Sequence, residues 1–274
     1  MNDFEFLRVI GIGQFVPVES PFRRLDGRAR LLVILLVLGG VLFTTNHLGI
    51  WVGLALIIAG YLASRLPLKL GLSGLLPPLP FILILAAIQV VYNPYPKIPP
   101  LLFHWWVISI YPVDVWAGAL MLLRFCGLLL GITLVTLTFS TSEMIHSLEG
   151  LLSPLAWVKV PVQDFAMIVQ VTLRFLPSLA QTAERVAKAQ AARGGDWGAG
   201  RGSLLSRARQ IVPMIVPLFV ISLHRGERMA LAMDSRGYGG PVKRTSMVVM
   251  KMRWVDYLAV LIAAMMALIT LFVR

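Results

Sequence analysis

The chain contains 274 residues, of which 58% are hydrophobic and 14% are charged, and its mean hydropathy is +0.80. These values exclude an ordinary soluble domain and are typical of a protein that crosses a membrane several times. The formal net charge of +12 does not indicate a nucleic-acid partner, because the Lys and Arg residues fall between apolar runs, as the positive-inside rule expects.

The first apolar run covers residues 31–64, which contain no charged residue. This is about twice the ~17–25 residues that one helical span requires. A polar break at 44–47 divides the run, so we expect two short membrane helices joined by a tight turn.

A third membrane helix is expected over residues 71–92, with its start kinked or delayed by the proline cluster at 77–80, because each proline removes a backbone donor. Residues 101–111, with two tryptophans, are too short to cross the bilayer and are typical of an interfacial segment. The sequence leaves open whether this segment re-enters the membrane.

The fourth and fifth membrane helices are expected over residues 115–139 and 255–273. Arg124 interrupts the fourth, and two interpretations stay open. Either a charge inside the span has a function, or the span begins later, near Cys126, and the arginine reaches the interface. Cys126 is the only cysteine, so no internal disulfide can form.

The Lys and Arg count predicts the orientation of these helices. Residues 1–30 hold five such residues, 65–69 hold two and 141–254 hold fifteen against seven acidic residues, whereas 92–114 hold only one. Five spans then place the N-terminus in the cytoplasm and the C-terminus outside.

Residues 141–254 are neither uniformly apolar nor loop-like, and we expect three amphipathic helices along the cytoplasmic membrane surface. The first covers 144–152, with Thr141-Ser142-Glu143 as its cap. The second, 162–192, would be roughly 45 Å long and kinked at Pro177. The third runs over 204–236, with breaks at Pro213 and Pro217, and Arg174 is expected to brace the two long helices.

The expected fold is therefore an all-α, polytopic membrane protein of about five transmembrane helices with long cytoplasmic helices. We divide it into four parts. These are a cytoplasmic N-terminal segment (1–30), transmembrane helices one to four (31–140), a cytoplasmic or interfacial helical domain (141–254) and a C-terminal transmembrane helix (255–274).

Two of the cytoplasmic helices end in Arg followed by Gly, at Arg193-Gly194 and Arg236-Gly237, 43 positions apart. A cation in the last turn complements the helix dipole, and Gly can adopt the left-handed conformation that ends a helix. Capping alone explains either motif. A guanidinium also binds carboxylates on other proteins, so two such ends suggest docking into two similar partners.

Catalytic and metal-binding patterns are weak. His146 with Glu149 and His224 with Glu227 have the i, i+3 spacing of a metal pair, but without further ligands we interpret them as surface polar pairs. No phosphate-binding Gly-x-x-x-x-Gly-Lys-Ser/Thr motif is present, so we expect no nucleotide or other cofactor in this chain, and any ATP hydrolysis must come from a partner.

With its two Arg-Gly helix ends, the chain resembles the transmembrane coupling component of energy-coupling factor (ECF) transporters. This family includes cobalt and biotin versions and a shared-module type. The two Arg-centred motifs carry most of the resemblance, with Gly27 in place of a usual Pro and Asp234-Ser235 in place of Glu-Ala as departures. Further matching segments are Gly13-Gln14-Phe15, Ser20, Arg24-Leu25-Asp26-Gly27-Arg28, Thr141-Ser142-Glu143, Leu173-Arg174-Phe175-Leu176-Pro177 and Arg244-Thr245.

The resemblance implies a plasma-membrane importer for a vitamin or metal ion, most similar to the shared-module type. This chain would be its non-catalytic scaffold, between two P-loop ATPases, identical or paralogous, that bind ATP and Mg²⁺, and a small substrate-capture membrane protein. It implies ATPase docking by Ala192, Arg193, Gly194, Ser235, Arg236 and Gly237. As the surface that meets the capture protein we expect the apolar residues Ile211, Val212, Ile215, Val216, Leu218 and Phe219. The alternative is an integral membrane enzyme, or a scaffold without an ATPase partner.

Overall fold

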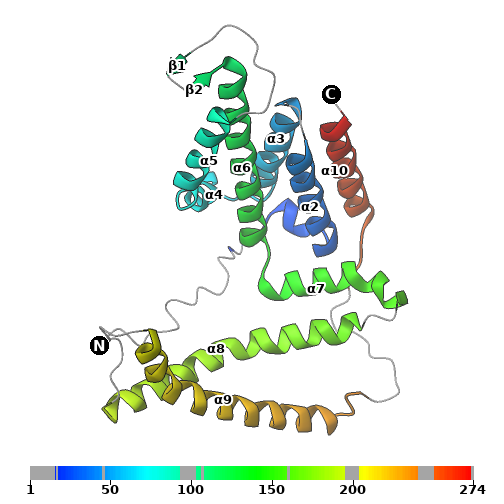
Figure 1. The fold of residues 1–274 in the computed structure, drawn as a ribbon. Coiled ribbons are helices and arrows are strands. Elements are labelled where there is room, and N and C mark those ends of the chain that lie inside the picture. The colour runs from blue at the N-terminus through cyan, green and yellow to red at the C-terminus, as the bar shows by residue number, and fades with distance from the viewer. Residues whose placement is uncertain are drawn as a thin grey trace. The chain divides into compact units, whose positions relative to one another are not determined.

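The computed structural model describes residues 16, 18–44, 47–92, 103–105, 108–158, 161–194, 204–239 and 250–272. The chain divides into two compact units, one formed by residues 13–154 with 250–274 and the other by residues 1–12 with 155–249. We call the first unit the helix bundle and the second, of which two long helices are described, the helix pair. The described fold is helical apart from one short β-hairpin, in agreement with the predicted all-α class (Figure 1).

The helix bundle has α2 at its centre. This helix packs against α3, α6, α7 and α10, and Figure 1 shows α10 running alongside it. The described elements of the bundle are η1 (Pro21–Arg24), α2 (Gly27–Phe43), α3 (His47–Ala63), α4 (Leu68–Leu75), α5 (Leu79–Val91), β1 (Phe103–Trp105), β2 (Ile108–Ile110), α6 (Pro112–Thr138), α7 (Thr141–Leu152) and α10 (Trp254–Phe272). A 3₁₀ helix, η2 (Ser153–Val158), follows α7.

Small residues let α10 lie close to α2. A side chain added at Gly40 of α2 would meet Ala267 and the Thr270 hydroxyl of α10. At the end of α2, the Thr44 hydroxyl donates a 2.8 Å hydrogen bond to the Thr270 carbonyl. Close backbone approach through small residues is how helices pack where burial of apolar surface between them gives no advantage over lipid.

The apolar core joins three helices. Val37 and Val41 of α2, Tyr61 of α3 and Leu134 of α6 are buried together. The Tyr61 hydroxyl donates a 3.0 Å hydrogen bond to the Leu130 carbonyl, so its polar atom is satisfied inside the bundle. A second cluster at the end of the bundle where α2 begins contains Phe22, Leu31, Ile34 and Phe139.

The helices occupy the regions where apolar runs predicted them. Helices α2, which begins earlier at Gly27, and α3 cover the apolar run at 31–64, and the predicted polar break lies between the end of α2 and the start of α3. Over residues 71–92, the proline cluster produces a 65° bend between α4 and α5. By length and composition, and within the described residues, only α6 forms a simple span, and the bent pair α4–α5 counts as a second if it is one span. The count of five transmembrane helices therefore stays a prediction.

The two-stranded hairpin lies in the segment predicted to be interfacial. Strands β1 and β2 pair antiparallel, with Phe103 opposite Ile110 and Trp105 opposite Ile108. The side chain of Asp114 then starts α6 by accepting a 2.9 Å hydrogen bond from the Tyr111 N–H. Helix α6 is continuous from Pro112 to Thr138, so Arg124 lies inside the helix, and both interpretations of where the membrane span begins along it stay predictions.

The helix pair consists of α8 (Val162–Ala192) and α9 (Leu204–Asp234). The bounds of α8 confirm the predicted 162–192, and α9 ends two residues before the predicted 236. Helix α9 is continuous through Pro213 and Pro217, so the expected breaks do not occur. The cap of α7 also differs from the prediction, since Ser140 rather than Thr141-Ser142-Glu143 accepts the Glu143 N–H at 3.2 Å.

Candidate partner-docking site

Helix α8 ends in a glycine-supported cap. Arg193 occupies the C-cap with φ −88° and ψ 10°, and Gly194 follows in the left-handed region at φ +82°. The Gly194 N–H donates to the Ala191 carbonyl at 3.0 Å, and the Arg193 N–H donates to the Gln190 carbonyl at 3.1 Å. Ala192, Arg193 and Gly194 are all exposed.

Helix α9 ends with the same geometry and one further bond. Arg236 stands at the C-cap and Gly237 follows at φ +75°. The Gly237 N–H donates to the Asp234 carbonyl at 2.8 Å, and the Tyr238 N–H donates to the Met233 carbonyl at 3.0 Å, which completes a Schellman motif. Ser235, Arg236 and Gly237 are exposed, like their counterparts on α8.

Backbone groups, rather than the arginine side chains, satisfy these helix ends. Among the residues that the structure describes, neither guanidinium forms a hydrogen bond or an ion pair. Each arginine is thus held at a defined backbone position while all five of its donors remain available. Such a guanidinium can form a bidentate pair with a carboxylate, through two parallel hydrogen bonds.

The two helices pair antiparallel. The Gln190 side chain donates to the Pro213 carbonyl at 3.2 Å, and the Arg225 guanidinium donates to the Ser178 hydroxyl. These contacts are twelve residues apart on each helix and run in opposite directions (Figure 1). The bracing that the sequence assigned to Arg174 is therefore made by Arg225, while Arg174 is exposed.

Because the helices are antiparallel, the two arginines lie at opposite ends of the pair. Gln190 lies beside Pro213, so Arg193 is level with residue 210 of α9, and Arg236 lies 26 residues further along. At 1.5 Å per residue this separates the two ends by roughly 40 Å. One partner groove of ordinary size cannot hold both.

The predicted apolar surface on α9 is exposed. Val212, Ile215, Val216 and Phe219 have 52%, 52%, 55% and 65% of their surface accessible, and their spacing places them along one stripe. Leu218 is half-buried and lies off this stripe. The side chain of Ile211 lies outside the described residues.

A matching stripe on α8 was not among the predicted site residues. Phe165, Ile168 and Leu176 are 64%, 61% and 36% exposed. Their spacing of three and eight positions is helical and could have identified them. In the antiparallel pair, this stripe lies in the half that carries Arg236, and the α9 stripe lies in the half that carries Arg193, so both halves have one apolar stripe and one arginine.

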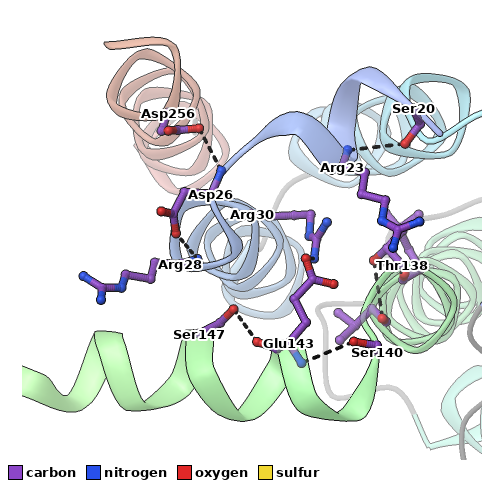
Figure 2. A network of polar contacts seen from close by, with 12 residues as sticks. Ser20, Arg23, Asp26, Arg28, Arg30, Thr138, Ser140, Glu143, Ser147 and Asp256 are labelled. Carbon is purple, nitrogen blue, oxygen red and sulfur yellow. Dashed lines mark hydrogen bonds and ion pairs between the residues drawn. The ribbon is translucent and has the colours of Figure 1, made fainter. Parts of the chain in front are cut away.

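A buried polar network closes the end of the bundle where α2 begins (Figure 2). The Arg30 side chain is completely buried, its Nη2 atom lies 2.7 Å from a Glu143 oxygen, and its guanidinium carbon lies 4.0 Å from the centre of the Phe139 ring. This ion pair ties α7 to α2. The sequence did not predict this ion pair, because Arg30 directly precedes the apolar run at 31–64 and was counted only among the basic residues that flank it.

Acidic side chains bind backbone groups beside this pair. The Asp256 carboxylate accepts the Asp26 N–H at 3.0 Å and the Arg253 N–H at 2.6 Å, which joins the start of α10 to the start of α2. Asp26 in turn caps α2 by accepting the Arg28 N–H at 3.0 Å. The matching segment around Asp26 and Arg28 is thus a structural joint, as Figure 2 shows.

The His–Glu pairs lie on single helices. His146 and Glu149 are 3.6 Å apart on α7, and His224 and Glu227 are 3.2 Å apart on α9. In the described ranges, no group of three metal-binding side chains forms around either pair. Neither pair contributes to the docking site.

Comparison with known proteins assigns this architecture. The family model CbiQ, described as "Cobalt transport protein", matches residues 18–247. The chain belongs to this family of ECF transporter transmembrane components. Proteins named "Energy-coupling factor transporter transmembrane protein EcfT" are similar to it over most of their length. That of Clostridium kluyveri is 32% identical and that of Brevibacillus brevis 34% identical, with 96–98% of each chain covered. The protein of Thermanaerovibrio acidaminovorans is 37% identical over 89% of this chain and 88% of its own.

Family membership makes the chain a membrane protein of a transport complex. The relatives are named as the transmembrane component of the transporter. The family match covers the segments that form α8 and α9 as well as the bundle from η1 to α7, so the helix pair is part of the shared architecture.

Proposed function

We propose that this chain is the scaffold of an ECF-type importer, which transmits ATP-driven movement of two ATPase subunits to a substrate-capture membrane protein. The observation that carries the proposal is the pair of equivalent helix ends, each presenting an exposed arginine at a C-cap, at opposite ends of one antiparallel helix pair. Two equivalent ends suit two similar partners.

The separation of the ends supports a mechanical role. Each arginine docks into a carboxylate-bearing groove of one P-loop ATPase, and these partners hold ATP and Mg²⁺. When ATP binding closes the ATPases, the two ends are driven together. The antiparallel helices are joined by the Ser178–Arg225 and Gln190–Pro213 contacts, so movement at either end reaches both helices.

The exposed apolar stripes supply the second surface. Val212, Ile215 and Phe219 are more than half exposed, and large exposed apolar patches mark places that a partner or lipid covers. The capture protein rests on this surface and tips to release a vitamin or metal ion inward. The N-terminus and the helix pair face the cytoplasm of the cell membrane, as the distribution of basic residues indicates.

Charge reversal at the two ends tests the docking. We expect Arg193→Glu or Arg236→Glu to abolish uptake and ATPase co-purification while the chain remains in the membrane, because each end would then repel a carboxylate groove. Arg228→Glu is the matched control. Arg228 is exposed on α9, and its guanidinium donates only within its own helix, to the His224 carbonyl at 3.3 Å.

The measurements are substrate uptake by whole cells and the subunits recovered from solubilised membranes. Normal uptake by the double variant Arg193→Glu/Arg236→Glu would refute the docking role. Recovery of the wild-type chain without any ATPase, together with turnover of a lipid or peptide, would favour a membrane enzyme instead.

A further inference from the structure

A hollow in the helix bundle is not used by the proposed coupling. It lies between the tips of α2 and α3, the end of α5 and the first half of α6, with a volume of about 590 Å³. We call it the Arg124 hollow, after the cation in its wall. It is lined by Leu42, His47, Gln89, Trp116, Leu120 and Arg124, with further apolar residues of α6.

Helix lengths explain why this hollow exists. Helices α2 and α3 have 17 residues each, or about 25 Å, whereas α6 has 27 residues, or about 40 Å. The Arg124 guanidinium donates to the Thr44 carbonyl, so the tip of α2 is level with the middle of α6. The α6 residues beyond this level have no α2 beside them.

The hollow lies near the expected outer surface of the bilayer. Arg124 is 14 residues, or about 21 Å, along α6 from Thr138, which lies beside the charged network of Figure 2. A hydrocarbon layer of about 30 Å would therefore end about 9 Å beyond Arg124, close to Trp116. A tryptophan at that level is typical of the membrane interface.

Polar side chains in the hollow have unused hydrogen-bonding capacity. Within the described residues, no carboxylate pairs with Arg124, and its buried Nε atom has no partner. In the same part of the chain, Gln89 makes no hydrogen bond, and the His47 ring contacts only the edge of Trp116, at 6.0 Å. Arg124 thus has a backbone carbonyl as its partner but no counter-ion among the described residues.

We propose that the Arg124 hollow binds an anionic phospholipid, with the headgroup phosphate against Arg124 and Gln89 and one acyl chain along the apolar wall of α6. The acidic headgroup supplies a negative charge beside Arg124, whose acceptor among the described residues is the uncharged Thr44 carbonyl. The apolar wall, which includes Leu120 and Leu128, excludes a purely hydrated anion. The volume lies within the ~300–1,000 Å³ of ordinary small-molecule sites.

The bound lipid fills the space beside the first half of α6 that α2 and α3 do not reach. Without it, Arg124 would face hydrocarbon in the hollow. The site is independent of the ATPase-docking ends, so a failed lipid test leaves the proposed coupling untouched, and the reverse also holds.

Native mass spectrometry of the full chain, purified from membranes with its partners, tests the site. The probes are phosphatidylglycerol, phosphatidylcholine of the same acyl chains and inorganic phosphate. We expect the wild type to retain phosphatidylglycerol over phosphatidylcholine by about tenfold. Both lipids carry the phosphate, but the choline cation of phosphatidylcholine offsets its charge and is repelled by Arg124. Arg124→Gln should remove the preference, and Lys69→Gln, which alters an exposed cation on α4, should keep it.

A second variant covers the case in which Arg124→Gln does not fold, because Arg124 also binds the end of α2. Ala117→Phe fills the hollow and leaves Arg124 in place. It should lower retention of both lipids. Unchanged phosphatidylglycerol retention in either variant, or displacement of the lipid by inorganic phosphate, would overturn the proposal.

Discussion

The helix bundle and the helix pair use arginine in opposite ways. Arg30 in the bundle is completely buried, ion-paired with Glu143 and stacked on Phe139. Arg193 and Arg236 in the helix pair are exposed, and the backbone already satisfies the helix ends that carry them. Arg30 is thus paired within the bundle, whereas the helix pair leaves the guanidinium donors of Arg193 and Arg236 for another molecule.

The two units also use glycine differently. In the bundle, glycines stand where two helices touch, as at Gly27 against Ser147. In the helix pair, Gly194, Gly226 and Gly237 have no neighbour near a hypothetical side chain. Gly27 therefore serves packing in the bundle, whereas Gly194 and Gly237 serve the left-handed backbone at the ends of α8 and α9. This difference can be tested by substitution.

Breaking the Arg30–Glu143 pair should have the largest effect on stability. We expect Glu143→Leu to lower the free energy of unfolding by about 3 kcal/mol, because a buried cation loses its partner. Thermal unfolding of the solubilised chain measures this loss. Glu149→Leu, on the same helix, removes only a 3.6 Å contact with His146 and should cost at most about 0.5 kcal/mol.

The double variant Arg30→Met/Glu143→Leu sharpens that test. It removes both charges and should recover most of the lost stability, since an apolar pair of similar volume can replace a buried ion pair. If the double variant is as unstable as Glu143→Leu alone, an unpaired charge is not the cause.

Gly27→Ala should have a smaller but clear effect. The added methyl group would overlap the fully buried Ser147 hydroxyl, which donates to the Glu143 carbonyl at 2.7 Å. Overpacking of this kind costs about 1–3 kcal/mol. Gly39→Ala, on the same helix with no atom nearby, should instead raise stability by up to about 1 kcal/mol. Equal unfolding temperatures for both variants would contradict the close packing of α2 on α7.

Gly237→Ala should have the smallest effect, confined to the end of α9. The left-handed backbone at φ +75° costs an alanine about 1 kcal/mol, and the neighbouring Arg236 then loses its fixed position. Hydrogen exchange at the Gly237 and Tyr238 amides should accelerate about fivefold. Gly226→Ala, in the interior of α9, should leave exchange at this end unchanged.

Much of the helix layout could be predicted from periodicity and breaking residues. The charge-free run at 31–64 with its polar break predicted α2 and α3, and the amphipathic segment 162–192 with the Arg193-Gly194 stop predicted α8. Local chemistry determines such boundaries, so a single sequence carries the signal. The breaks predicted at Pro213 and Pro217 were wrong. Each proline lacks a backbone N–H donor, yet α9 continues through both.

Contacts between distant segments could not be predicted in the same way. Nothing near Asp256 indicates that it accepts the Asp26 N–H, 230 positions away. Likewise, the level of Arg124 relative to the α2 tip depends on helix lengths and packing. The resemblance supplied the docking residues, but the antiparallel register that separates them came only from the Ser178–Arg225 and Gln190–Pro213 contacts.

The hydrogen bonds that join α10 to both ends of α2 have a consequence for biosynthesis. Helix α2 leaves the ribosome early, yet Asp256 and Thr270, which bind its two ends, are made only after the whole helix pair. Helix α2 therefore lacks its α10 neighbour, which covers Gly40, until more than two hundred further residues have been translated. A nascent chain that stops inside the helix pair would leave this face of α2 without the helix that covers it in the complete bundle.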